Sequence, residues 1–170
     1  MVIGASTRVV GIIGWPVKHS LSPAMHNAAF AAMELDWTYV PLPVRPGDLP
    51  RAVKGLLALG LAGANVTIPH KEEALRLMDD VSPGAGLIGA VNTIARANGR
   101  LVGHNTDGIG FLRSLEGKWS PRGETVVILG AGGAARAIAI QLALAGVGKI
   151  HLINRTLPRA CRLADEIQER

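Results

Sequence analysis

The chain has 170 residues, 48% of them apolar, which suffices for one full domain and part of another and excludes a disordered protein. One cysteine, Cys161, excludes a disulfide framework and favours a reducing compartment, so we expect a cytoplasmic protein. The net charge of +5 is spread along the chain and few aromatic residues accompany it, which favours small anionic ligands over nucleic acid. The N-terminal apolar run is interrupted by Arg8 and closed by Trp15-Pro16, so we predict neither a signal peptide nor a membrane span.

The first part of the chain alternates strands with helices. We predict strands over 8–14 and 37–44, because both are short apolar runs rich in β-branched residues. A helix follows the first strand, with Ser22 as its N-cap and Pro23 at its first position. A second helix over 46–60 carries an apolar face and ends at a glycine.

A third strand over 63–68 precedes a third predicted helix, over 69–80. Pro69 suits its first position, where the missing N–H is harmless. That assignment puts Lys71 in the first helical turn, where the helix dipole disfavours a cation by roughly 0.3–1 kcal/mol. An unfavourable lysine next to two glutamates needs an explanation. It is either a surface lysine offset by its neighbours or a residue kept for chemistry.

The middle of the chain changes character. Asn98-Gly99 lies between two extended runs and predicts a hairpin, and 106–115 predicts a helix. The polar, turn-rich stretch 117–123 suggests a boundary, so we divide the chain into a domain over 1–116 and another over 117–170.

Beyond the boundary the strand–helix alternation resumes, with strands near 124–129 and 149–153 and a final helix from residue 157. This pattern predicts an α/β protein with a mostly parallel sheet, followed by a Rossmann-type domain. That second domain is incomplete, because a mononucleotide-binding half has three parallel strands and only two are present. The bare edge of the last strand could be covered by a second copy, as in a homodimer, or by a missing segment.

A glycine turn joins the strand at 124–129 to the next helix. Gly130, Gly132 and Ala135 have the G-x-G-x-x-A spacing, and their place between a strand and a helix predicts nucleotide binding. The competing interpretation is a helix start that needs glycines only for packing. No acidic residue ends the next strand; Arg155, Thr156 and Arg159 stand there instead, which favours the 2′-phosphate of NADP over NAD. Both arginines could otherwise be solvated residues.

Polar side chains cluster at junctions of the first domain, where parallel sheets bind their ligands. The clusters are Ser20 with Ser22, Asn65 with Thr67 and Lys71, Asn92 with Thr93, and Asn105 with Thr106 and Asp107. Hydroxyls and amides suit a small polyhydroxylated ligand. Alternatives remain: Ser22 and Asp107 could only cap helices, and Asn92 could only serve a turn. The histidines match no common zinc spacing, so we predict no metal site.

Six ordered segments make the chain resemble the shikimate dehydrogenase family. They are IGWPVKHSLSPAMHNAAF, ANVTIPHK, GAVNTI, GHNTDGIGF, GAGGAARA and NRTLPRA, and they run through nearly the whole chain. The family reduces 3-dehydroshikimate to shikimate reversibly with NADPH, on the route to aromatic amino acids. A quinate/shikimate dehydrogenase is the nearest alternative. The resemblance also implies a missing C-terminal part that completes the nicotinamide site, so the chain alone could instead be a non-catalytic binding fragment.

The resemblance implies a role for each matching residue. Ser20 and Ser22 would bind the substrate carboxylate, and Lys71 with Asp107 would form the catalytic pair. The ring hydroxyls would be held by Asn65, Thr67, Asn92 and Asp107. The cofactor would be held by Gly130, Ala131, Gly132, Gly133 and Ala134 at the pyrophosphate and by Asn154, Arg155, Thr156 and Arg159 at the ribose and its 2′-phosphate. Lys71 would then supply the proton that the reduced carbonyl oxygen needs, which explains its position.

Overall fold

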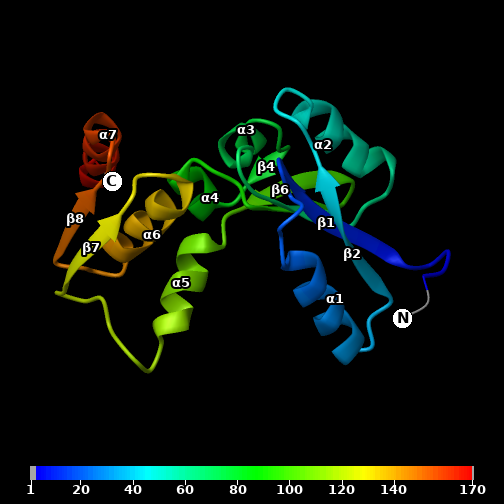
Figure 1. The fold of residues 1–170 in the computed structure, drawn as a ribbon, viewed down its shortest axis with the longest axis horizontal. Coiled ribbons are helices and arrows are strands. Elements are labelled where there is room, and N and C mark those ends of the chain that lie inside the picture. The colour runs from blue at the N-terminus through cyan, green and yellow to red at the C-terminus, as the bar shows by residue number, and fades with distance from the viewer. Residues whose placement is uncertain (1–2, 170) are drawn as a thin grey trace. The chain divides into compact units, whose positions relative to one another are not determined.

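The structure is a computed structural model that describes residues 3–169. The chain forms two compact units, Met1–His104 and Asn105–Arg170. Each unit is α/β (Figure 1). No helix among the described residues is long and apolar enough to cross a lipid bilayer.

The first unit is built on one six-stranded sheet with the order β2-β1-β3-β5-β6-β4. The strands are β1 Arg8–Gly14, β2 Trp37–Pro43, β3 Gly63–Val66, β4 Asp80–Val81, β5 Thr93–Ala97 and β6 Arg100–His104. Only β5 runs antiparallel to its neighbours. The Asn98-Gly99 turn reverses the chain with positive φ angles of 51° and 76°, so the predicted hairpin is confirmed.

Four helices accompany this sheet: α1 Ser22–Ala32, α2 Leu49–Ala58, α3 Lys71–Leu75 and α4 Pro83–Ile88. The apolar face expected on the second helix is buried, with Leu49, Val53 and Leu56 each at most 4% exposed. These side chains join Ile13 and Val66 in one core cluster, which fixes α2 on the sheet. On its other side, α1 packs against β2 (Figure 1).

Two sequence predictions about helix ends are wrong. Ser22 is the first residue of α1 and not its N-cap, which is Leu21. The predicted helix over 69–80 is far shorter, since α3 covers only five residues and its N-cap is His70. The chain leaves the helix because Asp79 accepts a 2.7 Å hydrogen bond from the Leu101 N–H, and this bond leads directly into the pairing of β4 with β6. Neither β4 nor α4 was predicted.

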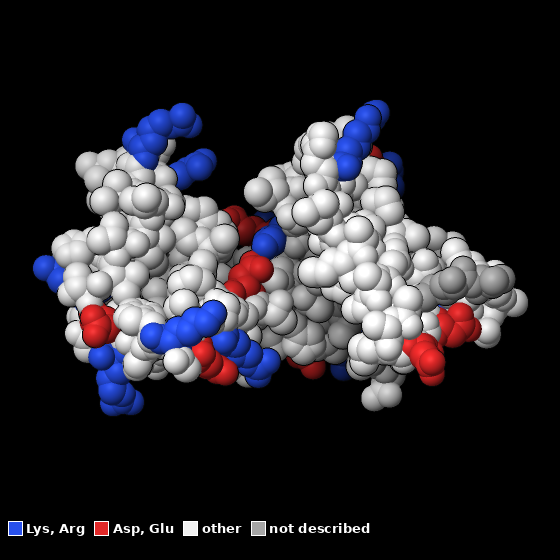
Figure 2. Space-filling view, turned by 60° about the horizontal axis from the view of Figure 1, so that its bottom comes forward, with Lys and Arg blue, Asp and Glu red and all other residues white. Residues whose placement is uncertain are grey.

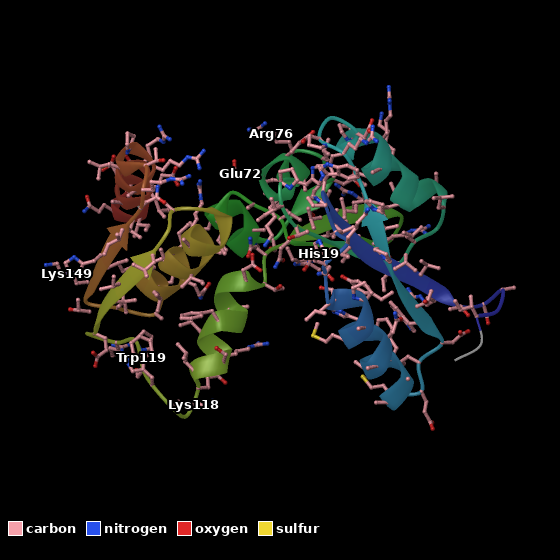
Figure 3. All side chains as sticks on the ribbon, in the orientation of Figure 1. His19, Glu72, Arg76, Lys118, Trp119 and Lys149 are labelled. Atoms are coloured by element: carbon pink, nitrogen blue, oxygen red, sulfur yellow. The ribbon has the colours of Figure 1, made fainter. Side chains whose placement is uncertain are left out.

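The second unit contains α5 Asp107–Leu115, β7 Thr125–Leu129, α6 Gly133–Leu144, β8 Lys149–Ile153 and α7 Leu157–Gln168. Strands β7 and β8 pair in parallel, as the alternation predicts. Helix α5 packs on α6 at Gly108, where a Cβ would come within 2.5 Å of the Ala137 carbonyl oxygen. This close packing places α5 in the second compact unit, ahead of the expected boundary at 116. The connection from α5 to β7 carries Lys118 and Trp119 (Figure 3).

One face of the β7–β8 sheet is uncovered in the described part of the chain. Val127 is 56% exposed, Leu129 78% and Ile153 56%, while the residues between them are half-buried against the helices. No other described strand pairs with either β7 or β8. The sequences of β7 and β8 carry apolar residues on both faces, as strands buried on both sides of a sheet do. Here only the face toward the helices is half-buried.

Candidate functional site

The candidate site of the first unit lies at the carboxyl edge of its sheet. Strands β1 and β3 end at this edge, and β5 begins there because it runs in the opposite direction. Asn65 near the end of β3 therefore pairs directly with Thr93 at the start of β5. The antiparallel strand brings polar residues together that are almost thirty positions apart in the sequence.

A hydrogen-bonded network links these residues. The Tyr39 hydroxyl donates to Asn65 Oδ1 at 2.8 Å, so the Asn65 amide nitrogen turns to Thr93 Oγ1 at 3.1 Å. Thr93 Oγ1 in turn donates to Asn92 Oδ1 at 2.9 Å. Each donor and acceptor in this series is fixed by its neighbour, so the amides are held in one orientation before any ligand arrives.

Tyr39 is a residue of this site that the sequence did not reveal. Its side chain is 3% exposed, and burial raises its pKa to about 12, although a hydrogen bond with the Ser22 side chain acts in the opposite direction. The phenol therefore stays protonated and joins Ser22 to Asn65. Asn27 fixes its backbone with two hydrogen bonds of 2.8 and 2.9 Å, and the His26 ring stacks on it at 4.3 Å. In the sequence it looks like any strand residue, and its being the chain's single tyrosine was the only signal.

The two serines sit at the start of α1. The Ser22 N–H donates to Ser20 Oγ at 3.3 Å, so Ser20 satisfies a backbone group that a capping Ser22 would have left open. The N-cap prediction fails because the Ser22 hydroxyl forms a hydrogen bond with Tyr39 and does not cap the helix. Both serines are half-buried.

Thr67 and Lys71 lie in the turn after β3 and at the start of α3. The Thr67 N–H donates to the Ile13 carbonyl at 2.8 Å, which ties the turn to β1. The Lys71 carbonyl accepts from the Val91 N–H at 2.8 Å, which ties α3 to the segment before β5. Lys71 is half-buried, whereas the labelled Glu72 and Arg76 point outward from α3 in Figure 3. The Thr67–Ile13 and Lys71–Val91 bonds fix the backbone on either side of this turn, and the Lys71 side chain extends from there.

Asp107 belongs to the second unit, where it is the first residue of α5. Its N–H donates to Asn105 Oδ1 at 3.1 Å, and its side chain is half-buried. Thr106 is the N-cap of that helix and makes no capping bond with its side chain. The pairing of Asp107 with Lys71 remains a proposal.

The glycine turn of the second unit is where the sequence predicts a phosphate cradle. Gly130 has a φ of 111°, a conformation that favours glycine, and its N–H donates to the Ile153 carbonyl at 2.7 Å. Gly132 is the N-cap of α6 and Gly133 its first residue. A Cβ at either position would meet no heavy atom within 4 Å, so the space in front of this helix start is open. Ala131 and Ala134 flank it.

The end of β8 lies beside this turn through the Gly130–Ile153 bond. Asn154 Nδ2 donates to the Thr156 carbonyl at 2.8 Å, which shapes the turn into α7. Arg155, Thr156 and Arg159 are exposed, and no carboxylate stands among them. The open glycine turn and these cationic side chains fit a dinucleotide that carries a 2′-phosphate.

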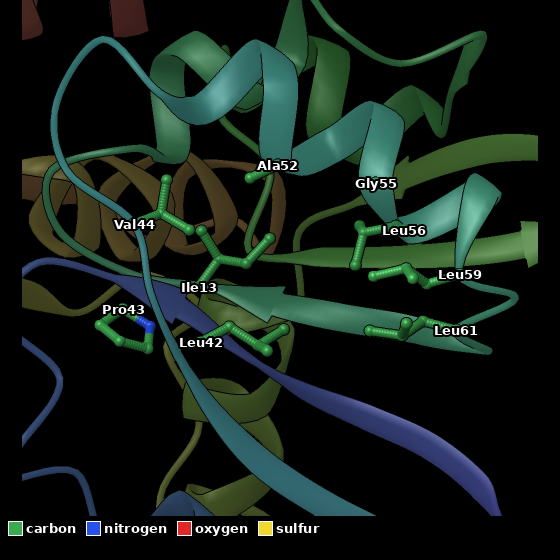
Figure 4. A pocket seen from close by; sticks show the side chains of 9 residues that line it. All are labelled: Ile13, Leu42, Pro43, Val44, Ala52, Gly55, Leu56, Leu59 and Leu61. Carbon is green, nitrogen blue, oxygen red and sulfur yellow. The ribbon is translucent and has the colours of Figure 1, made fainter.

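An apolar pocket of the first unit is a separate feature. It has a volume of about 270 Å³ and lies between α2 and the strands, with Leu42, Leu56 and Leu61 among its lining residues (Figure 4). It offers no polar side chain, so a polyhydroxylated ligand has no partner there. Among residues 3–169, no group of three His, Cys, Asp or Glu side chains is placed to hold a metal ion.

Comparison with known proteins gives matches along most of the chain. The family described as "Shikimate dehydrogenase substrate binding domain" matches residues 12–94, and "Shikimate / quinate 5-dehydrogenase" matches residues 115–170. A protein of Desulforamulus reducens named "Shikimate dehydrogenase (NADP(+))" is 52% identical over 98% of this chain and 58% of its own length. The chain belongs to the shikimate dehydrogenase family.

Solved structures agree with this membership. Shikimate 5-dehydrogenase from Listeria monocytogenes, in complex with shikimate and NAD, matches with a TM-score of 0.93 and 42% identity over 99% of this chain and 60% of that one. A 5-ketofructose reductase of Gluconobacter sp. matches with a TM-score of 0.92 and 44% identity over 98% of this chain and 60% of that one. The chain thus spans about three fifths of the length of the family members that it matches.

Proposed function

We propose that the protein to which this chain belongs is an NADP-dependent shikimate dehydrogenase that interconverts 3-dehydroshikimate and shikimate. The observation that carries the proposal is the fixed network of Ser22, Tyr39, Asn65, Thr93 and Asn92. It presents oriented amides and hydroxyls at one sheet edge, as a ring with several hydroxyl groups requires. The names of the matching family members support the same substrate.

In this proposal the substrate-binding residues act in two groups. Ser20 and Ser22, at the start of α1, hold the substrate carboxylate. Asn65, Thr67, Asn92 and Asp107 hold the ring hydroxyls. The residues 1–116 would form the substrate-binding domain, and 117–170 the first part of the cofactor domain. Location in the cytoplasm and assembly as a homodimer belong to the proposal as well.

Lys71 and Asp107 carry the proton chemistry. NADPH, when bound, supplies the hydride to the carbonyl carbon of the substrate. Lys71 donates a proton to the carbonyl oxygen as negative charge develops there, and in the reverse direction it accepts that proton. Asp107 orients the Lys71 ammonium and contacts a substrate hydroxyl.

The cofactor proposal rests on the second unit. The N–H groups at the start of α6 would hold the pyrophosphate, with Gly132 and Gly133 leaving room for it. Arg155 and Arg159 would pair with the 2′-phosphate, which NAD lacks. In Figure 2 the basic side chains of the visible face are separated by acidic and uncharged ones. Small phosphate-bearing ligands suit this distribution better than a nucleic acid does.

The test is NADP reduction by shikimate, measured with the protein that includes the C-terminal part. Quinate and 5-ketofructose serve as competing substrates, and NAD as the competing cofactor. Folded protein without turnover on shikimate would refute the proposal, and higher kcat/KM for quinate would favour a quinate/shikimate dehydrogenase. Calorimetry with the 170-residue chain alone would show whether it binds shikimate or NADP without turnover, as a non-catalytic fragment does.

Lys71→Ala is the sharpest single substitution. Loss of a proton-transfer group should lower kcat at least ~10²-fold while the KM for shikimate changes far less. Asp107→Ala should affect both constants, because Asp107 also contacts the substrate. A raised KM with unchanged kcat in Lys71→Ala would make Lys71 a binding residue and refute its proposed role.

A further inference from the structure

His70, the residue before Lys71, is a buried imidazole that the proposed chemistry does not use. Its side chain is 1% exposed, and the ring Nε2 lies 2.8 Å from the Val44 carbonyl oxygen. A carbonyl can only accept, so Nε2 carries the hydrogen and the ring donates. His70 is also the N-cap of α3, yet its side chain caps no helical N–H. Asn, Asp and Ser usually fill this position and bond their own helix. Here the side chain reaches to another element instead.

The His70–Val44 bond completes a set of hydrogen bonds that joins the carboxyl ends of β1, β2 and β3. The Val44 N–H donates to the Gly14 carbonyl at 3.1 Å, which joins the end of β2 to β1. The Thr67 N–H donates to the Ile13 carbonyl at 2.8 Å, which joins β3 to β1. The His70 N–H donates to the Thr67 carbonyl at 3.0 Å, and the ring then returns to Val44. His70 thus links the turn after β3 to β2 by a side chain where no backbone bond is described.

The position of the Lys71 backbone depends on this bond between His70 and Val44. A lysine side chain is a flexible four-carbon stem, so its ammonium is placed only if its backbone is placed. The Lys71 carbonyl is fixed on one side by the Val91 N–H at 2.8 Å. On the other side, the preceding residue is fixed by the His70–Val44 bond. Without the ring donor, His70 keeps its backbone bonds to Thr67 and Ala74, but the start of α3 loses its tie to the end of β2.

We propose that His70 is a positioning residue that sets the location of the Lys71 ammonium through its bond to the Val44 carbonyl. This inference rests on the proposed function, since it needs Lys71 to transfer a proton. His70 does not touch substrate in this proposal, because it is buried against the end of β2. This positioning requires an N–H donor at the place of Nε2, within hydrogen-bond distance of the Val44 carbonyl. A side chain of the same volume or aromatic character without that donor should not replace it.

The test compares two amides of different reach in the protein that includes the C-terminal part. His70→Gln places an amide N–H near the position of Nε2, whereas the amide of His70→Asn ends one bond short. We expect His70→Gln to keep kcat within about 3-fold, and His70→Asn to lower it roughly 10-fold with little change in the KM for NADP. His70→Phe keeps the volume without a donor and should resemble His70→Asn. Melting curves establish that each variant is folded at the assay temperature.

A merely structural role is distinguished by combining each variant with Lys71→Ala. If His70 acts through Lys71, His70→Asn should have no further effect on kcat in that background, because the group it positions is gone. Three outcomes would overturn the inference. His70→Asn could lower kcat equally in both backgrounds, or it could have the same kcat as the wild type. The Gln and Asn variants could also lower kcat by the same factor. Absence of turnover in the wild type would instead refute the proposed function and is recognised before any variant is assayed.

Discussion

Raising the pH should ionise Tyr39 at a higher pH than an ordinary tyrosine and should destabilise the fold in the process. Burial raises the pKa of Tyr39 from 10.0 to about 12, while the unfolded chain releases the proton near 10.0. Above pH 10 the native state therefore binds more protons than the unfolded state, so stability is fully present below pH 10 and is lost as the pH rises toward 12. At about 1.4 kcal/mol for each pKa unit, the upper limit of the loss is ~2.8 kcal/mol. Partial screening of the phenolate by solvent should reduce it to about 1–2 kcal/mol.

The assay is direct because Tyr39 is the chain's single tyrosine. Tyrosinate absorbance in the near ultraviolet, followed against pH, should have its midpoint near 12 in the folded chain and near 10 in urea. Tyr39→Phe is the matched control. At neutral pH it leaves Asn65 Oδ1 without its donor and should lower the free energy of unfolding by about 1–3 kcal/mol. Above pH 10 the gap between variant and wild type should shrink, because only the wild type loses stability through the phenol.

A midpoint near 10 in the folded chain would refute the reasoning. It would mean that the phenol is solvated and that the Tyr39–Asn65 bond does not persist in solution. A stability gap that stays constant up to pH 12 would contradict the linkage even if the absorbance midpoint were high.

Three further predictions concern the second unit. Replacing Arg155 and Arg159 together by glutamine should raise the KM for NADP at least ~10-fold and leave the KM for NAD nearly unchanged, as steady-state kinetics would show; equal effects on both cofactors would exclude a 2′-phosphate clamp. Gly130→Ala should destabilise the unit by about 1–2 kcal/mol because of its positive φ, whereas Gly133→Ala, facing open space, should not. Both should weaken NADP binding in calorimetry, and unchanged binding in Gly133→Ala would contradict the cradle. Hydrogen exchange should show residues 124–170 less protected than the first unit, because one face of the β7–β8 sheet is exposed and no other described strand pairs with either of its edges; equal protection in a monomer would count against this.

Local patterns of the sequence determined most of the second unit. The strand, glycine turn and helix at 124–146 were predicted because every cue in that stretch is short-ranged: an apolar run, a glycine that needs a positive φ and an alanine-rich helix. The hairpin at Asn98-Gly99 was predicted for the same reason. The motifs also gave the candidate site residues by number, since each motif is contiguous.

The tertiary structure decided where those residues meet. The length of α3 was wrong because the Asp79–Leu101 bond and the pairing of β4 with β6 join segments about twenty residues apart, and no local cue reports them. Tyr39 and His70 were missed as site residues for a related reason. Their roles come from burial and from partners on other strands, Asn65 and Val44, and a side chain's hydrogen-bond partners are fixed only when the sheet brings the strand ends together.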